Sequence, residues 1–180
     1  MNLREQWTAL RTIVRKEVVR FMRIWSQTLL PSAITQTLYF VIFGKFIGVQ
    51  IGAIDGISYM AFIVPGLVMM AVINNSFSNV VSSFYGTKFQ RSVEELLVSP
   101  TPTWVIMAGY VSGGTLRGIL VGAVVFVVSC FFTHPVIFNI GIIVLFIVLT
   151  AMVFSLGGLI NAIFARSFDD VSIFPTFVLT

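Results

Sequence analysis

The sequence is poor in charged residues and contains one cysteine. Of its 180 residues, 10% are charged and 57% are hydrophobic, and the mean hydropathy is +0.99. A soluble domain carries about 25% charged residues. The composition therefore excludes an ordinary soluble domain and predicts an integral membrane protein. Cys130 alone cannot form an internal disulfide, and one cysteine with one histidine cannot build a Cys/His metal cluster.

The sequence motifs of common enzymes are also missing. There is no G-x-x-x-x-G-K-[ST] phosphate loop, so we expect no nucleotide hydrolysis of the P-loop type by this chain. There is no H-E-x-x-H motif and no carboxylate pair within the apolar runs, and His134 stands beside Pro135 in a predicted outer turn. We therefore expect a protein that is not an enzyme, with no metal and no cofactor bound by this chain.

Long apolar runs dominate the rest of the chain. A bilayer core of about 30 Å requires about 20 apolar residues per helix, and complete runs of that length occupy residues 25–47, 59–84, 104–132 and 136–164. A fifth run begins at Val171 and stops at Thr180, which as a helix rises only about 15 Å. We predict an all-α, polytopic transmembrane bundle with four complete spanning helices and the start of a fifth, in a chain truncated at its C-terminus.

Residues 1–24 are predicted to form an amphipathic helix. Its apolar face consists of Leu3, Trp7, Leu10, Val14, Val18 and Phe21, and its basic face of Arg4, Arg11, Arg15 and Lys16. This pattern favours a helix in the headgroup region, where anionic lipid attracts basic side chains. The alternative is a soluble cytoplasmic helix.

Basic residues also predict the orientation and the partner surface. Nine of them lie beside the same ends of the apolar runs, in the N-terminal segment, around Lys88 and Arg91, and at Arg166, whereas Lys45 lies at the opposite side. The positive-inside rule then predicts a cytoplasmic N-terminus. The net charge of +4 favours a membrane surface over nucleic acid as the partner, because the aromatic residues lie in the apolar runs.

The cytoplasmic loop 86–103 contains a predicted short helix between Phe89 and Pro100. Ser92 is the expected N-cap, Glu95 completes a capping box, and Pro100 ends the helix. One edge of this helix is expected to be apolar and to consist of Val93, Leu96 and Leu97. The acidic pair Glu94 and Glu95 lies beside it. Such an edge fits either a docking contact with another protein or an ordinary solvated connector.

Polar residues inside the apolar runs are candidates for a structural or a functional role. Arg117 lies near the middle of the third run, where a charge costs at least about 2.5 to 3.5 kcal/mol, so we expect it to face the protein interior or a wet cavity. It either binds an anionic group or gates a path, or it is a structural partner of nearby asparagines such as Asn74. Asn75, Asn79 and Ser83 form one stripe that either contacts neighbouring helices or lines a substrate path.

Small residues predict close helix packing in the third run. Gly114, Gly118 and Gly122 recur at every fourth position, with Gly109 and Gly113 on a neighbouring strip. Glycine at this spacing lets another helix approach the backbone closely. The pair Gly157-Gly158 predicts a similar contact in the fourth run.

The run R-S-V-E-E-L-L-V-S-P, placed between the second and third spanning helices, resembles the first cytoplasmic loop of ABC-2-type transporter permeases. The N-terminal amphipathic helix, the Trp at the start of the first spanning run and the Ser-Phe-Asp-Asp segment are similar too. The resemblance is strongest to bacterial inner-membrane, multidrug-type exporters. Many members have Gly-Thr where this chain has Ser92-Val93, and members have about six spanning helices.

This resemblance implies that residues 1–180 are a single, incomplete permease domain without catalytic residues. It implies a homodimer that works with a separate ABC ATPase subunit, which binds ATP and Mg²⁺, and that forms an export path in the inner membrane. It places the contact that receives the ATPase stroke at Arg91, Glu94, Glu95, Leu96, Leu97 and Pro100. It places a second cytoplasmic loop at Arg166, Asp169 and Asp170. The alternative is a small channel or scaffold that works without nucleotide.

Overall fold

The computed structural model describes residues 2–51, 53–54, 57–133, 139–167, 169–172 and 175. Its helices are α1 (Leu3–Arg23), α2 (Trp25–Tyr39), the π-helix η1 (Phe40–Ile47), α3 (Gly48–Ile51), α4 (Tyr59–Phe89), α5 (Ser92–Val98), α6 (Thr103–Cys130) and α7 (Ile140–Phe164). Two-residue strands, β1 (Ala53–Ile54) and β2 (Ile57–Ser58), pair antiparallel between α3 and α4. The predicted helical bundle is confirmed.

The spanning helices follow the predicted apolar runs. Within the described residues, α4, α6 and α7 are each long and apolar enough to cross a membrane. The first run folds as α2, η1 and α3 in succession, with 15, 8 and 4 residues, and at about 1.5 Å per residue this path is also long enough. The predicted turn at His134 and most of the predicted fifth run lie outside the described residues.

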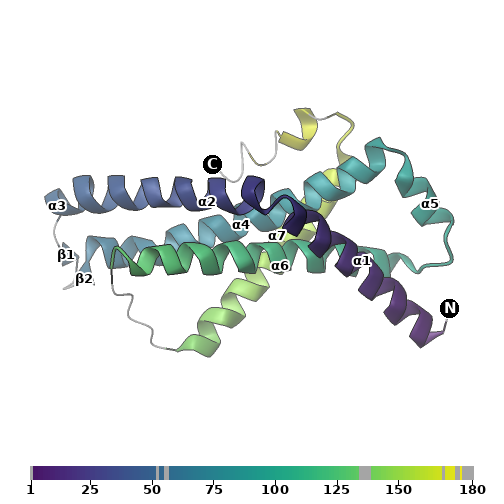
Figure 1. The fold of residues 1–180 in the computed structure, drawn as a ribbon, viewed down its shortest axis with the longest axis horizontal. Helices are drawn as coiled ribbons and strands as arrows, with labels where there is room; N and C mark the ends of the chain where they lie inside the picture. The colour runs from purple at the N-terminus through teal and green to yellow at the C-terminus, as the bar shows by residue number, and fades with distance from the viewer. Residues whose placement is uncertain are drawn as a thin grey trace.

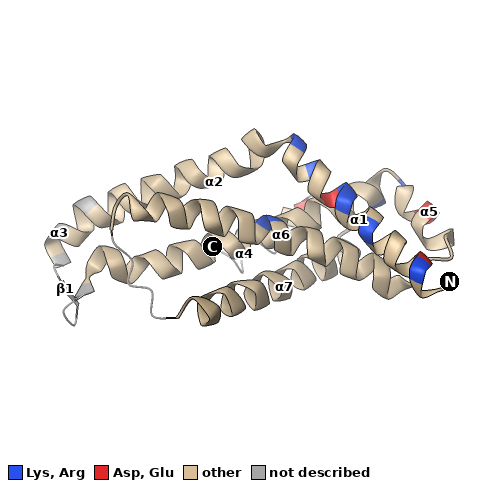
Figure 2. Cartoon of the chain, turned by 60° about the horizontal axis from the view of Figure 1, so that its bottom comes forward, with Lys and Arg blue, Asp and Glu red and all other residues tan. Residues whose placement is uncertain are grey.

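Helices α2, α4 and α6 lie lengthwise through the bundle, and α7 runs obliquely to them (Figure 1). Helix α6 occupies the centre, because it contacts α1, α2, α4 and α7. Helices α1 and α5 gather at one end of the molecule, where most of the coloured acidic and basic residues also lie (Figure 2). The end of the molecule that contains α1 and α5 is thus rich in charge, whereas the rest of the bundle along the long axis is mostly apolar.

The glycine strip of α6 that contains Gly109 and Gly113 packs against α1. A Cβ atom added at Gly109 would collide with Ile13, and one added at Gly113 would lie 2.6 Å from Cβ of Glu17. The second half of α1 therefore runs alongside α6 in the same direction instead of lying flat in the headgroup region along its whole length. The first half keeps its apolar side chains Leu3 and Trp7 exposed, as the prediction of an interfacial helix requires.

The glycine strip of α6 that contains Gly114, Gly118 and Gly122 packs against α4. A Cβ atom at Gly114 would lie 2.9 Å from the carbonyl oxygen of Ser76, and one at Gly118 would lie 3.1 Å from that of Val72. In α7, a Cβ atom at Gly158 would lie 2.6 Å from the carbonyl oxygen of Phe77. These glycines bring three helices into backbone contact, which confirms the predicted close packing.

Three buried apolar clusters lie in the described part of the chain, and two of them are the larger ones. One joins α4 and α6 to η1 and contains Phe40, Val64, Val68, Ala71, Val121 and Val125. The other, here called the Tyr110 cluster, joins α4, α6 and α7 and contains Val80, Ile106, Tyr110, Val111 and Leu159. The outer face of α7, by contrast, exposes large apolar side chains from Ile140 to Phe164, which requires lipid or another protein surface.

Adjacent glycines in α7 allow a matched test of this packing. We expect Gly158→Ala to destabilise the fold by about 1 to 3 kcal/mol, because its new methyl group would press on the α4 backbone. Gly157→Ala should leave stability unchanged or raise it by up to about 1 kcal/mol, because no atom lies within 4 Å of its new methyl group. Melting temperatures in detergent compare the two; equal melting temperatures would contradict the packing described.

Candidate functional site

Helix α5 leaves α4 through a tight turn. Arg91 is the N-cap residue and adopts a left-handed conformation with φ 58°, which costs a non-glycine residue about 1 to 2 kcal/mol. The predicted N-cap at Ser92 is wrong, because Ser92 is already the first helical residue. The helix ends at Val98, and Pro100 follows closely, as predicted. The two spanning helices α4 and α6 thus hold α5 through short connections.

The exposed side of α5 combines apolar and acidic side chains. Leu97 is 68% exposed and Val98 is 87% exposed, and Glu94 and Glu95 are exposed beside them. Leu96 instead packs against the Tyr110 cluster. The predicted edge of Val93, Leu96 and Leu97 is therefore divided, because Leu97 faces outward whereas the other two side chains are half-buried.

A cleft of about 760 Å³ separates α5 from α1. Its lining includes Lys16 of α1, Ser92 and Glu95 of α5, and Tyr110 of α6. Lys16 Nζ lies 6.0 Å from the ring centroid of Tyr110, and the Tyr110 hydroxyl lies 3.2 Å from Oγ1 of Thr87 in α4. Tyr110 therefore links three helices at the base of this cleft.

Lys88 joins the C-terminal ends of α4 and α7. Its Nζ donates hydrogen bonds of 2.8 Å to the carbonyl oxygens of Ile163 and Ala165. The last carbonyls of a helix lack intrahelical partners, and a lysine that binds them stabilises the helix end. Lys88 thus fixes the start of the segment after α7 beside the end of α4.

The segment after α7, predicted to be the second cytoplasmic loop, contains a turn closed by Asp170. Its Oδ2 accepts hydrogen bonds from the backbone N–H groups of Arg166 and Ser167, at 3.0 and 3.1 Å. These two N–H groups hold the pKa of Asp170 below its ordinary value. Arg166 and Asp169 are exposed, so the predicted loop residues divide into one that shapes the turn and two that face outward.

Arg117 of α6 meets the polar stripe of α4 inside the bundle. Its Nη1 donates to Oδ1 of Asn79 and its Nη2 to Oδ1 of Asn75, each at 3.3 Å. Asn75 also exchanges hydrogen bonds with Ser32 of α2. The structure therefore brings the predicted residues Arg117, Asn75 and Asn79 together, and they connect α2, α4 and α6.

Sequence reasoning missed two members of this cluster, Glu17 and Arg20 of α1. Glu17 is 0% exposed; its Oε1 accepts a 2.6 Å hydrogen bond from Ser83, and its Oε2 lies 3.1 Å from Nη2 of Arg20. Arg20 Nη2 also donates to Oδ1 of Asn79 at 2.8 Å. The available signal was spacing, because Glu17 lies four residues from Ile13 and from Phe21 on one helical face.

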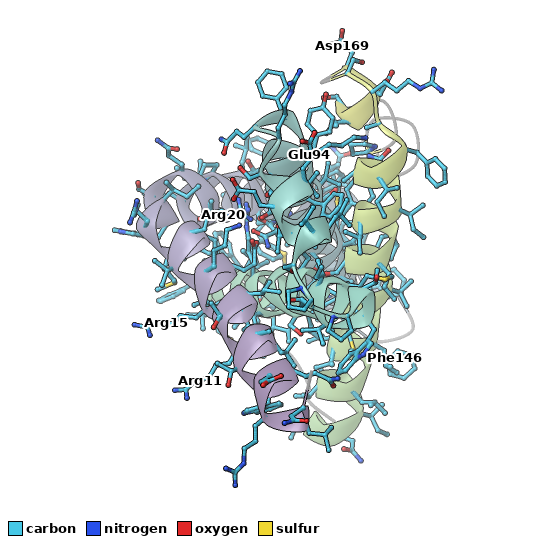
Figure 3. All side chains as sticks on the ribbon, turned by 90° about the vertical axis from the view of Figure 1, so that its right-hand side faces the viewer. Arg11, Arg15, Arg20, Glu94, Phe146 and Asp169 are labelled. Carbon is cyan, nitrogen blue, oxygen red and sulfur yellow. The ribbon has the colours of Figure 1, made fainter. Side chains whose placement is uncertain are left out.

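Figure 3 shows how the arginines of α1 divide between the two sides of the helix. Arg11 and Arg15 project away from the bundle, whereas Arg20 lies between α1 and the helices behind it. The outward pair suits contact with lipid headgroups. The inward one completes the polar cluster formed by Glu17, Arg20, Asn75, Asn79, Ser83 and Arg117.

The polar cluster carries more positive than negative charge. Arg20 and Arg117 donate to the same oxygen, Oδ1 of Asn79, with bonds of 2.8 and 3.3 Å. Their donor nitrogens therefore lie no more than about 6 Å apart, where two unit charges repel by about 3 kcal/mol at an effective dielectric constant of about 20. Glu17 supplies one carboxylate, and the buried Nε atoms of both arginines lack an acceptor.

No metal site accompanies this chemistry in the described part of the chain, where no group of three or more His, Cys, Asp or Glu side chains could hold an ion. The polar cluster instead consists of hydrogen-bond donors and acceptors from three helices, α1, α4 and α6. Such contacts hold helices together in lipid, where apolar surface alone gives little preference for one neighbour over another. The cluster thus fixes α1 against α4 and α6.

The contact between Glu17 and Ser83 can be measured in a double-mutant cycle. We expect Glu17→Ala to cost about 3 to 5 kcal/mol, because it leaves Arg20 without its carboxylate, and Ser83→Ala to cost about 1.5 to 3 kcal/mol. The double variant should cost less than the sum, since the two changes remove the same bond. Ser82→Ala, one residue away and exposed, is the control for unfolding measurements. Simple additivity would show that the contact does not form.

The turn at Asp170 should respond to acid. Because its pKa is lowered in the folded protein, the carboxylate contributes stability above the ordinary aspartate pKa, and that contribution disappears as the pH falls through the folded value. We expect the amides of Arg166 and Ser167 to exchange hydrogen faster in Asp170→Asn and in wild type at acidic pH, after correction for intrinsic rates. Unchanged protection in the variant would contradict this role.

The chain is similar to known transport proteins along most of its length. The model of the family described as ABC-2 type transporter matches residues 8–180. Inner membrane transport permease YadH of Escherichia coli (strain K12) is 58% identical over 97% of this chain and 68% of its own length. Nodulation protein J of Rhizobium leguminosarum bv. viciae is 22% identical over 92% of this chain and 64% of its own length. No solved structure matches the chain.

The family match includes all the elements that form the candidate site. It begins within α1 and continues through α4, α5, α6 and α7. The resemblance to this family, read from the residues of the loop 86–103, is therefore confirmed by a match over residues 8–180. This chain belongs to the ABC-2 type transporter family.

Proposed function

We propose that this chain is the membrane-spanning permease subunit of an ATP-driven exporter in the inner membrane. A separate ATPase subunit binds ATP and Mg²⁺, and this chain forms the translocation path and receives the ATPase stroke through α5. The family membership and the similarity to a protein named inner membrane transport permease support this proposal. This chain performs no covalent chemistry.

The observation that carries the proposal is the two-sided construction of α5. Its outer side exposes Leu97 and Val98 beside Glu94 and Glu95, and exposed apolar side chains with an acidic pair suit a complementary groove on a partner. Its inner side inserts Leu96 into the bundle. A partner that presses on the outer side therefore acts directly on the packed interior.

The Tyr110 cluster is the proposed route for this force. Leu96 of α5 and Ile13 of α1 both pack against it, and the cluster itself belongs to α4, α6 and α7. The contact between Tyr110 and Thr87 couples α6 to α4 at the same level. A displacement of α5 is thus distributed to the spanning helices instead of being absorbed by a loose loop.

The proposed orientation places α1 and α5 in the cytoplasm. Basic side chains gather at the end of the molecule that contains these two helices (Figure 2), and the cytoplasmic side of membrane proteins carries the excess of lysine and arginine. Lys88 and Arg91 lie beside α5, and Arg166 follows α7. An ATPase subunit, which requires cytoplasmic ATP, meets α5 in this orientation.

The proposed assembly contains two copies of this chain and two ATPase subunits. The exposed apolar face of α7 leaves surface for another protein or for lipid. A two-fold dimer is the commonest symmetric solution. The route would then open at the interface between the two copies when α4 and α6 tilt.

Variants at neighbouring leucines separate docking from folding. We expect Leu97→Asp to weaken the complex with the ATPase subunit at least about tenfold, without a change in melting temperature, because Leu97 is exposed. Leu96→Ala should instead lower the stability of the permease by about 1 kcal/mol or more, because this side chain packs into the bundle. A complex of Leu97→Asp as tight as that of wild type would contradict docking at α5.

Coupling itself is tested by Glu95→Arg after co-expression with the ATPase subunit and purification in mild detergent. We expect wild type to form a two-to-two complex and Glu95→Arg to lose transport-linked ATP hydrolysis while remaining folded, because Glu95 is exposed on α5. The mass of the complex and its ATPase rate are the measurements. Unchanged coupling in the folded variant would remove the proposed role of this acidic residue.

A further inference from the structure

The polar cluster has an unbalanced charge that is accessible from outside the bundle. Arg20 and Arg117 share one amide oxygen, whereas the sequence places one acidic residue, Glu17, at this level. Arg20 is 29% exposed along its side chain, and Arg117 is half-buried. Part of each arginine side chain is therefore open to the surroundings, although the Nε atoms of both are buried.

The surface next to these arginines is apolar. Val19 and Leu116, the immediate sequence neighbours of Arg20 and Arg117, are exposed. Asn79 lies ten residues before the end of α4 at Phe89, which is about 15 Å of helix, within the depth of one bilayer leaflet of about 20 Å with its headgroups. A free ion would be costly at this depth, whereas a headgroup attached to acyl chains is already close by.

We propose that Arg20 and Arg117 bind the phosphate group of an anionic amphiphile from the cytoplasmic leaflet. The phosphate oxygens accept hydrogen bonds from the two planar guanidinium groups, which match oxyanions well, and the acyl chains lie on the exposed apolar surface beside Val19 and Leu116. The bound phosphate supplies the negative charge that Glu17 alone does not. This site does not depend on the ATPase subunit or on coupling through α5.

Native mass spectrometry of the full chain in mild detergent tests the proposal. The probes are phosphatidylglycerol and diacylglycerol with the same acyl chains, which differ in the phosphate-bearing headgroup. We expect wild type to retain phosphatidylglycerol at least about tenfold more tightly than diacylglycerol. Equal retention of the two would overturn the proposal, whatever the outcome of the ATPase experiments.

Two arginine variants locate the site. We expect Arg117→Gln to lose about tenfold in affinity for phosphatidylglycerol, whereas Arg166→Gln, which removes an exposed charge from the segment after α7, should bind as wild type does. Equal losses in both variants would mean that general surface charge attracts the lipid and would overturn the assignment. If Arg117→Gln does not fold, Arg117→Lys keeps the charge without the planar guanidinium group and should show a smaller loss of affinity for phosphatidylglycerol. Wild-type affinity in Arg117→Lys would contradict recognition of the phosphate by the guanidinium group.

A competition experiment identifies the form of the ligand. We expect excess inorganic phosphate to leave phosphatidylglycerol bound, because the acyl chains contribute to binding and the site lies within the leaflet. Displacement of the lipid by inorganic phosphate alone would identify a site for a small anion and would overturn the amphiphile assignment. The melting temperature of each variant shows that the compared proteins are folded.

Discussion

Helices surrounded by lipid gain little from burying apolar surface, so close backbone approach and polar contacts must hold them together. Helix α6 meets this constraint with glycines on two faces, one against α1 and one against α4. A larger residue at Gly113 would push Glu17 away from Ser83, and one at Gly118 would push α4 away from Arg117. The polar cluster exists because these glycines let charged and amide side chains meet across three helices.

The same approach of helices builds the base on which α5 rests. Tyr110 directly follows Gly109, the glycine that admits Ile13 of α1, and its ring and hydroxyl contact Phe84 and Thr87 of α4. Leu96 of α5 packs on this assembly. A seven-residue helix with no buried residue of its own thereby becomes part of the bundle, which is the property that the proposed transmission of an ATPase stroke requires.

The apolar runs, the glycine contacts and the position of α5 could be predicted because each depends on local composition or on helical spacing. The roles of Glu17 and Arg20 could not, because both lie among other charges on an amphipathic helix and their burial depends on where α1 meets α6. The cap at Arg91 was missed because the left-handed turn, and not a capping side chain, begins the helix. The division of the predicted apolar edge, with Leu97 outward and Leu96 packed on the bundle, could not be predicted, because a seven-residue helix gives spacing too little length to separate its faces.

The central claim, that α5 is the contact with the ATPase subunit, is tested most directly by site-specific cross-linking. In a Cys130→Ser background, which removes the exposed native thiol, Leu97→Cys should cross-link to the co-expressed ATPase subunit with a short thiol reagent. Phe164→Cys, equally accessible at the end of α7, serves as the control and should not. A cross-link from α7 that matches the one from α5, or none from α5 in an intact complex, would contradict the account.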